Sequence, residues 1–292
     1  MALPSTNRLR VAAIDFLNPA PLMWDFEHPP LNTGLAQRYQ LHYTDPAQCA
    51  TELHEGRADL GLIPIASLTP SLAIVPGCAI ASLDEVRSIQ LIVKLRASHD
   101  PVAIDHTFAS IRTIAADTAS RSSLAYAQIL FHKFIGANPQ FIPTAADPIA
   151  MLQQADAALL IGDPALLALE ARNHIEQNVG PCLWLDLARE WRTRTSLPWV
   201  AAVWAVRPEA VTDAAQLTAD LNASRDNGLA HIDQIVDEWT PRIAIPPETI
   251  RTYLTRNIHY TLDPACIESI HLFRALAAEI DLLPPLRTLR ML

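Results

Sequence analysis

Short apolar runs alternate with helical patterns along the first two thirds of the chain. Polar and apolar residues recur at helical spacing between the runs, as at Leu124, Ala127 and Leu130. The pair Asp45-Pro46 predicts a helix start, since aspartate caps helices and proline suits the first turn. Strands that alternate with helices form parallel sheets, so the pattern predicts an α/β fold. We predict buried strands at residues 10–16, 39–43, 58–63, 88–95, 111–115, 157–161, 183–185 and 199–206.

The pattern changes after residue 208, where helical spacing begins to dominate. The apolar runs at 88–95 and 199–206 enclose a middle block that has its own alternation of strands and helices. The sequence therefore predicts two α/β lobes that are joined by a two-stranded hinge and separated by a cleft. We assign residues 1–95 and 200–292 to the first lobe and residues 96–199 to the second. Near the end of the chain we predict helices at 209–223, 228–238, 246–256 and 264–281.

Composition excludes several classes of function. Half of the residues are hydrophobic, 18% are charged and the net charge is −9. An acidic protein repels nucleic acid and anionic lipid, so we expect neither as a partner. Residues 60–83 carry no charge, but Pro64, Pro70 and Pro76 would interrupt a membrane-spanning helix, and we expect strands there instead.

The chain's start and its cysteines indicate a cytoplasmic protein. The apolar run at residues 11–14 is too short for the core of a signal peptide. The four cysteines lie far apart, without a CxxC pair. We therefore expect a protein in the cytoplasm whose thiols are reduced and mostly buried.

The common cofactor and metal motifs are absent. The glycines are too widely spaced for GxGxxG, and Leu62-Ile63 stands where a P-loop needs lysine and a hydroxyl residue. There is no HExxH or GxSxG motif. The histidines, including His259 and His271, show no metal-ligand spacing. The sequence therefore predicts neither a cofactor nor a metal.

Short polar residues cluster where a predicted strand ends and a helix begins. Ser120, Arg121, Ser122 and Ser123 lie at such a point. The free N–H groups at a helix N-terminus attract anions, and hydroxyls beside them add donors. One hydroxyl is enough to cap a helix, so the surplus predicts a site for a carboxylate.

Four more residues lie at comparable positions. Asn18 follows the first strand; its amide could bind a ligand, but an asparagine before proline also suits a plain turn. Ser88 begins a later strand, and by itself it is more typical of a sheet surface. We also expect Gly162 and Asp163 to bind the substrate. Gly162 could let a ligand approach the backbone, and Asp163 is placed to cap a helix.

Segments around these residues resemble the chorismate dehydratases of the futalosine route to menaquinone, which have the type II periplasmic-binding-protein fold. The matching segments occur in the family's order along nearly the whole chain. The sequence departs from the family at Ser122, where threonine is usual, and at Ser196 and Asp84-Glu85, where glycine is common. The segments are residues 15–21, 56–64, 86–88, 117–123, 160–166, 186–187, 190–191, 197–199 and 258–260.

The resemblance implies a lyase that removes water from chorismate, with no cofactor, to give 3-[(1-carboxyvinyl)oxy]benzoate. Asn18 and Ser88 match family positions implicated in catalysis, so we expect them to orient the substrate and assist loss of its hydroxyl. Ser120, Ser122 and Ser123 would bind a carboxylate. No side-chain base stands out, and we hypothesise that the substrate's own enolpyruvyl carboxylate takes the proton.

Other functions are compatible with this fold. The sister enzyme, which makes 1,4-dihydroxy-6-naphthoate, would use a histidine base, and no histidine has a convincing cleft position. A solute-binding protein would need an export signal and a lipobox cysteine, and a LysR-type effector domain would need a DNA-binding segment. The oligomeric state, and the lobe that binds each carboxylate, stay open.

Overall fold

Two mixed sheets form the centre of the molecule. The structure is a computed structural model and describes residues 8–95, 104–118 and 121–292. In these residues the first sheet has the strand order β11-β4-β10-β3-β1-β2, and the second has the order β7-β6-β8-β5-β9. The first contains β1 (Leu9–Ile14), β2 (Tyr39–Thr44), β3 (Leu60–Pro64), β4 (Ala73–Ser82), β10 (Trp199–Val206) and β11 (His259–Thr261). The second contains β5 (Ile89–Lys94), β6 (Thr113–Asp117), β7 (Gln140–Thr144), β8 (Ala157–Ile161) and β9 (Cys182–Asp186).

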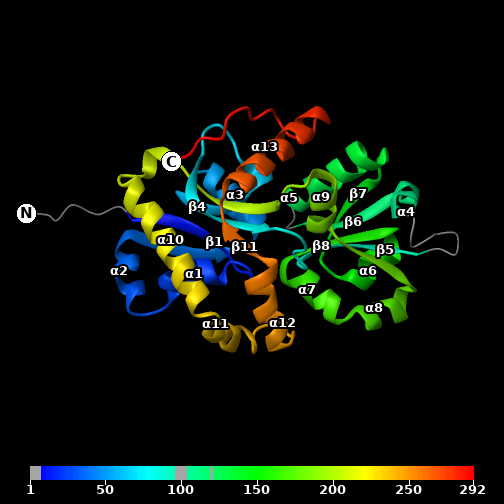
Figure 1. Ribbon diagram of the computed structural model, residues 1–292, viewed down its shortest axis with the longest axis horizontal. Helices are drawn as coiled ribbons and strands as arrows, with labels where there is room; N and C mark the ends of the chain where they lie inside the picture. The colour runs from blue at the N-terminus through cyan, green and yellow to red at the C-terminus, as the bar shows by residue number, and fades with distance from the viewer. Residues whose placement is uncertain (1–7, 96–103, 119–120) are drawn as a thin grey trace, which may run out of the picture.

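Both sheets follow one plan. Strand β1 is parallel to β2 and β3, and β6 is parallel to β7 and β8. Each sheet also takes in one antiparallel strand that arrives from the other sheet, β10 between β3 and β4 and β5 between β8 and β9. Figure 1 shows that both ends of the chain form one half of the molecule and the middle forms the other. The predicted α/β fold with two lobes is confirmed.

Strand β5 lies in a different sheet from the one we expected. We placed residues up to 95 in the first lobe, but β5 pairs with β8 and β9 in the second sheet. An antiparallel strand that enters a sheet is as apolar as the parallel strands around it, so its sequence does not show which sheet it joins. The division into domains at residues 95 and 199 otherwise stays a prediction.

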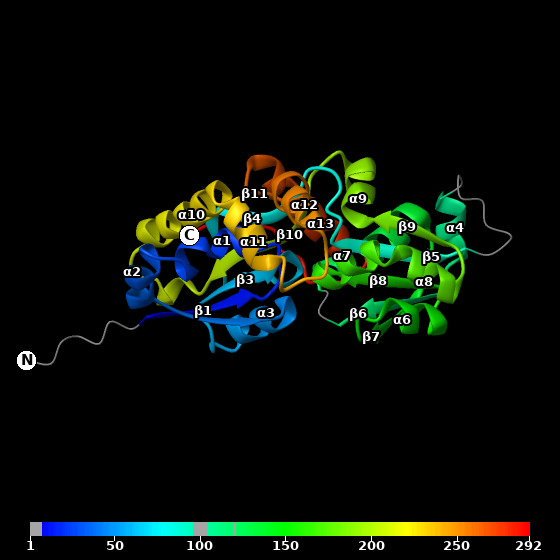
Figure 2. The ribbon, with the colours of Figure 1, turned by 90° about the horizontal axis from the view of Figure 1, so that it is seen from below.

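Helices lie on both sides of the sheets in each half (Figure 2). Several begin at an aspartate whose carboxylate accepts a backbone N–H, which satisfies one of the free donors at the helix start. The predicted Asp45 cap is confirmed, with a bond from Gln48 N. The first half contains α1 (Ala20–Glu27), α2 (Leu31–Arg38), α3 (Pro46–His54), α10 (Ala214–Ala230), α11 (Ile232–Trp239), α12 (Pro247–Thr252) and α13 (Pro264–Glu279). The second contains α4 (Ile104–Ser110), α5 (Ser122–Ile129), α6 (Pro148–Gln154), α7 (Gly162–Glu170), α8 (Arg172–Val179) and α9 (Leu187–Thr195).

The end of the chain is mainly helical, as predicted, with two differences. The helix predicted at 209–223 is the longer α10, which starts later and runs to Ala230. A π-helical turn, η4 (Tyr253–Asn257), extends α12 and leads into β11. Strand β11 was not predicted because three residues are too few to show a period of two.

An aromatic cluster connects the two halves. Tyr126 of α5 contacts Phe273 of α13, Trp191 of α9 and Trp199 of β10, with ring centroids 4.4, 4.8 and 5.5 Å apart. The Tyr126 hydroxyl also donates to the Val200 carbonyl at 3.2 Å. Buried aromatic contacts of this kind fix the relative position of the elements that carry them.

The uncharged segment at residues 60–83 forms strands, as predicted. All five residues of β3 are buried, and β4 follows after a 3₁₀ turn, η1 (Ile65–Ser67). No helix in the described ranges is both long and apolar enough to cross a bilayer.

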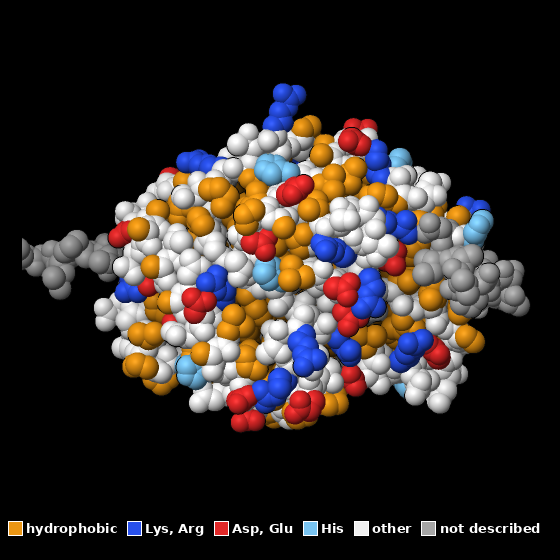
Figure 3. All heavy atoms as spheres, in the orientation of Figure 1, with side chains coloured by type: hydrophobic (Ala, Val, Ile, Leu, Met, Phe, Trp, Pro, Cys, Tyr) orange, Lys and Arg blue, Asp and Glu red, His pale blue; other side chains and the backbone are white. Residues whose placement is uncertain are grey.

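The four cysteines are free and buried, which confirms the thiol prediction. On the face in Figure 3, acidic and basic side chains are interspersed and form no continuous basic patch.

Candidate active site

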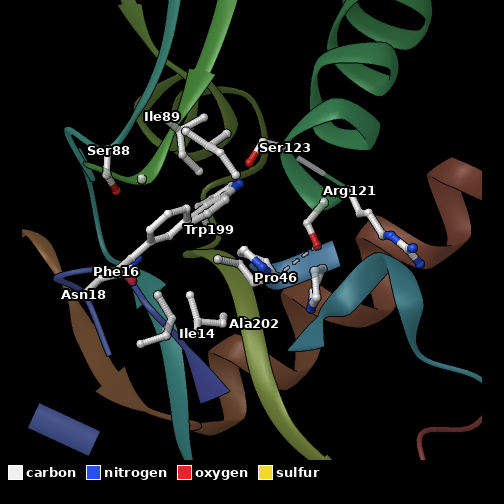
Figure 4. A pocket seen from close by; sticks show the side chains of 16 residues that line it. Ile14, Phe16, Asn18, Pro46, Ser88, Ile89, Arg121, Ser123, Trp199 and Ala202 are labelled. Atoms are coloured by element: carbon white, nitrogen blue, oxygen red, sulfur yellow. Dashed lines mark hydrogen bonds between the residues drawn. The ribbon is translucent and has the colours of Figure 1, made fainter. Parts of the chain in front are cut away.

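A cavity of about 60 Å³ lies between the edges of the two sheets. The parallel strands β1, β3 and β8 end there, and the antiparallel strands β5 and β10 begin there, because they run the opposite way. This edge is where open α/β sheets bind ligands. Its lining is mostly apolar and consists of Ile14, Phe16, Asn18, Pro46, Pro64, Ile80, Ser88, Ile89, Arg121, Ser122, Ser123, Ile161, Gly162, Trp199, Ala201 and Ala202 (Figure 4).

The structure brings most of the predicted site residues to this cavity. Asp163 is not in the lining, and Ser120 lies outside the described residues. In the view of Figure 4, Asn18 and Ser88 lie at one end, and Arg121 and Ser123 at the other. The six predicted residues that line the cavity are Asn18, Ser88, Arg121, Ser122, Ser123 and Gly162.

Backbone hydrogen bonds fix the loop that carries Ser88. The Asp186 carboxylate caps α9 and accepts the N–H groups of Val86 at 3.1 Å and Arg87 at 2.6 Å. The Ser88 carbonyl accepts the Gly162 N–H at 2.8 Å. Arg87 has φ of 64°, a left-handed conformation that is costly for a residue with a side chain. The surrounding bonds therefore hold this strained loop and set the position of Ser88.

Two tyrosines lie behind Asn18 and Ser88 and were not predicted as part of the site. The Tyr260 hydroxyl donates to the Asn18 carbonyl at 2.9 Å. Tyr253 is fully buried, and its hydroxyl has no hydrogen-bond partner among the described residues. Burial raises the pKa of Tyr253, and interactions with the side chains of Ser88 and Asn18 oppose that rise. Neither tyrosine was among the predicted site residues, because only the folded chain brings them to Asn18.

Gly162 is required for close packing. Its φ is 60°, and a Cβ at this position would lie 2.6 Å from Cε2 of Phe16. A side chain would therefore be strained and would also collide with the Phe16 ring. We expected a ligand to approach the backbone here, whereas the neighbour in the structure is Phe16.

The capping role predicted for Asp163 is wrong. Helix α7 begins at Gly162 after the N-cap Ile161, and no side chain caps it. Asp163 lies inside the first turn, and its Oδ1 accepts the Leu17 N–H from the other half at 3.0 Å. Burial raises the pKa of Asp163 to about 6, and the hydrogen bond from Leu17 opposes that rise. Asp163 therefore supports the segment beside Asn18 and does not line the cavity.

The residues that begin α5 have different roles. The Ser122 hydroxyl donates to the Ala201 carbonyl at 3.0 Å and accepts the Ala66 N–H at 3.2 Å. Its single proton is already used, so in this geometry it has none to donate to a carboxylate, and its predicted binding role stays a prediction. The Arg121 guanidinium points away from the cavity and donates to Thr51 at 2.8 Å. The Ser123 hydroxyl points inward and has no hydrogen bond to the described residues.

A buried arginine adds positive charge near Ser122. Arg274 of α13 is 3% exposed and donates to the carbonyls of Ala66 at 3.0 Å and Pro284 at 2.9 Å. No carboxylate among the described residues forms an ion pair with it, and burial lowers its pKa. An unpaired buried cation favours a nearby anion, because little solvent screens it.

The described lining contains no residue suited to act as a base. Arg121 is its only ionisable side chain, and arginine stays protonated.

His259, Asp263 and Cys266 form a cluster elsewhere whose possible ligand atoms lie within 4.8 Å of one another. Asp263 there caps α13 and accepts from His259 at 2.9 Å, and burial raises the pKa of Cys266 to about 12.

The chain matches a known protein family over most of its length. A family described as menaquinone biosynthesis matches residues 9–279. The chain belongs to the menaquinone biosynthesis family. A relative named chorismate dehydratase, from Thermus thermophilus, is 27% identical over 236 residues, which are 77% of this chain and 82% of the relative.

Solved structures place this member of the menaquinone biosynthesis family in the type II periplasmic-binding-protein fold. A protein from Archaeoglobus fulgidus aligns with a TM-score of 0.70 and 14% identity, over 96% of this chain and all of that one. The periplasmic aliphatic sulphonate binding protein of Escherichia coli aligns at 0.68 and 15%, over 99% and 94%. The alkanesulfonate-binding protein of Xanthomonas axonopodis aligns at 0.66 and 17%, over 99% and 97%. These identities are too low to show more than the fold, and the predicted fold is confirmed.

The raised pKa of Asp163 predicts a pH-dependent effect of Asp163→Asn. The folded protein keeps this proton up to about pH 6, whereas an unfolded aspartate loses it near pH 4. The wild type therefore loses stability as the pH rises from about 4 to 6. Asparagine keeps an acceptor for the Leu17 N–H but does not ionise. The Asp163→Asn variant should therefore be more stable than the wild type. The difference in their free energies of unfolding should grow over this pH range to about 2 kcal/mol.

Urea unfolding at pH 4 and pH 7.5 measures the difference. Asp59→Asn is the opposite control, because hydrogen bonds and charge from Arg10 lower the pKa of Asp59 despite partial burial. That variant should lose stability at pH 7.5. An equal gain in stability for Asp163→Asn at both pH values would contradict a raised pKa of Asp163.

Proposed function

We propose that this protein is a chorismate dehydratase of the futalosine route, that it forms 3-[(1-carboxyvinyl)oxy]benzoate and that it works in the cytoplasm. Membership of the menaquinone biosynthesis family supports this, as does the name of the Thermus thermophilus relative. One observation about the site carries the proposal. The described lining offers amide and hydroxyl groups in an apolar cavity and no side-chain base.

The reaction suits such a cavity. A hydro-lyase breaks a ring C–H bond of chorismate, and the electron pair forms a ring double bond as the neighbouring hydroxyl leaves. The lost proton and hydroxyl together make one water, and the ring becomes aromatic, which favours the products. We assign the proton transfer to the enolpyruvyl carboxylate of the substrate, because the described lining contains no aspartate, glutamate, histidine or lysine.

Asn18 and Ser88 are the proposed catalytic residues. Backbone contacts fix both, through Tyr260 for Asn18 and through Gly162 for Ser88. Prepositioned neutral donors stabilise the charge that develops on a leaving oxygen without needing to reorganise. We assign them to orienting the substrate and donating hydrogen bonds to the departing hydroxyl.

Contacts between the halves would exclude water during the reaction. Arg121 donates to Thr51, Ser122 bonds Ala66 and Ala201, and Asp163 accepts from Leu17. These contacts surround the cavity, so a ligand would enter when they separate and be enclosed when they form again.

Two alternatives are weaker. A naphthoate-forming enzyme of the same pathway would use a histidine base, and the described lining contains none. A solute-binding role has the sulfonate-binding relatives in its favour, but they support the fold alone.

Incubation with chorismate tests the proposal directly. We expect mass spectrometry to show conversion to a product that has lost one water. Chorismate that binds but stays unchanged would indicate a solute-binding protein. Turnover of the cyclic futalosine derivative instead would indicate the sister enzyme.

Asn18→Asp should abolish most of the activity. A carboxylate at this position would repel a dianionic substrate and remove an amide donor, and loss of one such donor lowers kcat on the order of 100-fold or more. Steady-state kinetics with chorismate measures the effect. Asn178→Asp is the matched control, since it adds the same charge on exposed α8, where Asn178 bonds only within its own helix. Near-normal turnover by the Asn18→Asp variant would contradict the assignment.

A further inference from the structure

Trp199 contains a buried donor without a partner. It is the first residue of β10, is 1% exposed, and packs against Tyr126. Its indole Nε1 has no hydrogen-bond partner among the described residues. A buried N–H that makes no hydrogen bond destabilises the fold, so most buried donors in proteins are paired.

The position of Trp199 distinguishes it from the other buried tryptophans. Trp191 donates from Nε1 to the Ser269 hydroxyl at 3.0 Å, so its donor is satisfied. Trp204, on the same strand, is fully buried and also unpartnered, but it does not line the cavity. Trp199 does line it, and its indole nitrogen points toward the Ser123 hydroxyl (Figure 4).

The two donors face the same end of the cavity. Ser123 lies in the first turn of α5, where the helix dipole favours negative charge. The Ser122 proton is used by Ala201, and the Arg121 side chain bonds Thr51. Ser123 and Trp199 are therefore the side-chain donors left at this end of the described lining.

We propose that the Trp199 indole N–H and the Ser123 hydroxyl together bind one carboxylate of the ligand. This inference rests on the proposed function only for the identity of the ligand. The negative charge of the ligand is inferred from the donors themselves. A carboxylate accepts several hydrogen bonds, and neutral donors beside a helix N-terminus suit a single negative charge. The flat rings of Trp199 and Phe16, with Ile89, give the walls that a carboxylate on a planar six-membered ring needs.

The variant Trp199→Phe tests the donor by kinetics. It removes the N–H and keeps an aromatic ring, and loss of a hydrogen bond to a charged group corresponds to about 10-fold to 100-fold in affinity. We expect the KM for chorismate to rise by about that factor, with kcat changed less than about threefold. Trp204→Phe is the matched control and should leave both constants within about twofold. Equal effects of the two variants, or a change confined to kcat, would overturn the proposal.

A spectroscopic test separates this inference from the proposed reaction. The chain has six tryptophans, so ¹⁵N-tryptophan labelling gives few indole N–H signals, and the two variants identify those of Trp199 and Trp204. Benzoate is the probe, because it is a carboxylate on a planar ring and cannot be dehydrated. We expect benzoate to move the Trp199 indole proton downfield, to leave that of Trp204 in place, and to bind the Trp199→Phe variant more weakly.

Each outcome of the benzoate titration decides the inference. Benzoate that fails to bind the wild type, or that binds without moving the Trp199 signal, would overturn it. A shifted Trp199 signal in a protein that leaves chorismate unchanged would overturn the proposed function and support the carboxylate site.

Discussion

The chain crosses between the two sheets twice, and the strand that follows each crossing determines the site. Strand β5 joins the second sheet and β10 joins the first, each antiparallel to its neighbours. An antiparallel strand begins where its parallel neighbours end. Both strands therefore begin at the carboxyl edges of the sheets, and the two edges face each other across the cavity. Ser88 immediately precedes β5 and Trp199 begins β10, so the two crossings bring both residues to the ligand site.

Much of the polar chemistry around the cavity holds the protein together. Asp186 fixes the loop before Ser88, Asp163 binds the segment before Asn18, and Ser122 connects α5 to the first half. Each of these groups forms hydrogen bonds to backbone atoms. Fewer groups keep a free hydrogen-bond donor. The groups that are already bonded hold those free donors in position. Once the halves have closed, a substrate would therefore lie in a mostly apolar cavity, with positive charge supplied by the start of α5 and by buried Arg274.

The sequence predicted most of the parallel strands, though not β7, and the residues at their ends, because apolar runs and helix starts are local signals. Asn18, Ser88 and Ser123 reached the cavity for this reason. The sequence did not reveal which hydroxyl would be free, since the partners of Ser122 lie 56 and 79 residues away. Trp199 and Tyr253 were not among the predicted site residues for the same reason. Each has a buried polar atom without a hydrogen-bond partner close to the cavity, and only the folded structure shows both the missing bond and the position.

The central claim is that the site works without a titrating side chain in its lining, and the pH dependence of kcat tests it most directly. Asp163, with a pKa of about 6, lies outside the cavity, so the profile is measured for the wild type and for the Asp163→Asn variant. We expect kcat with chorismate to be level from about pH 6.5 to 9 in both proteins, because substrate carboxylates stay ionised throughout. An acid limb near neutral pH in both proteins would reveal a side-chain base and contradict the account.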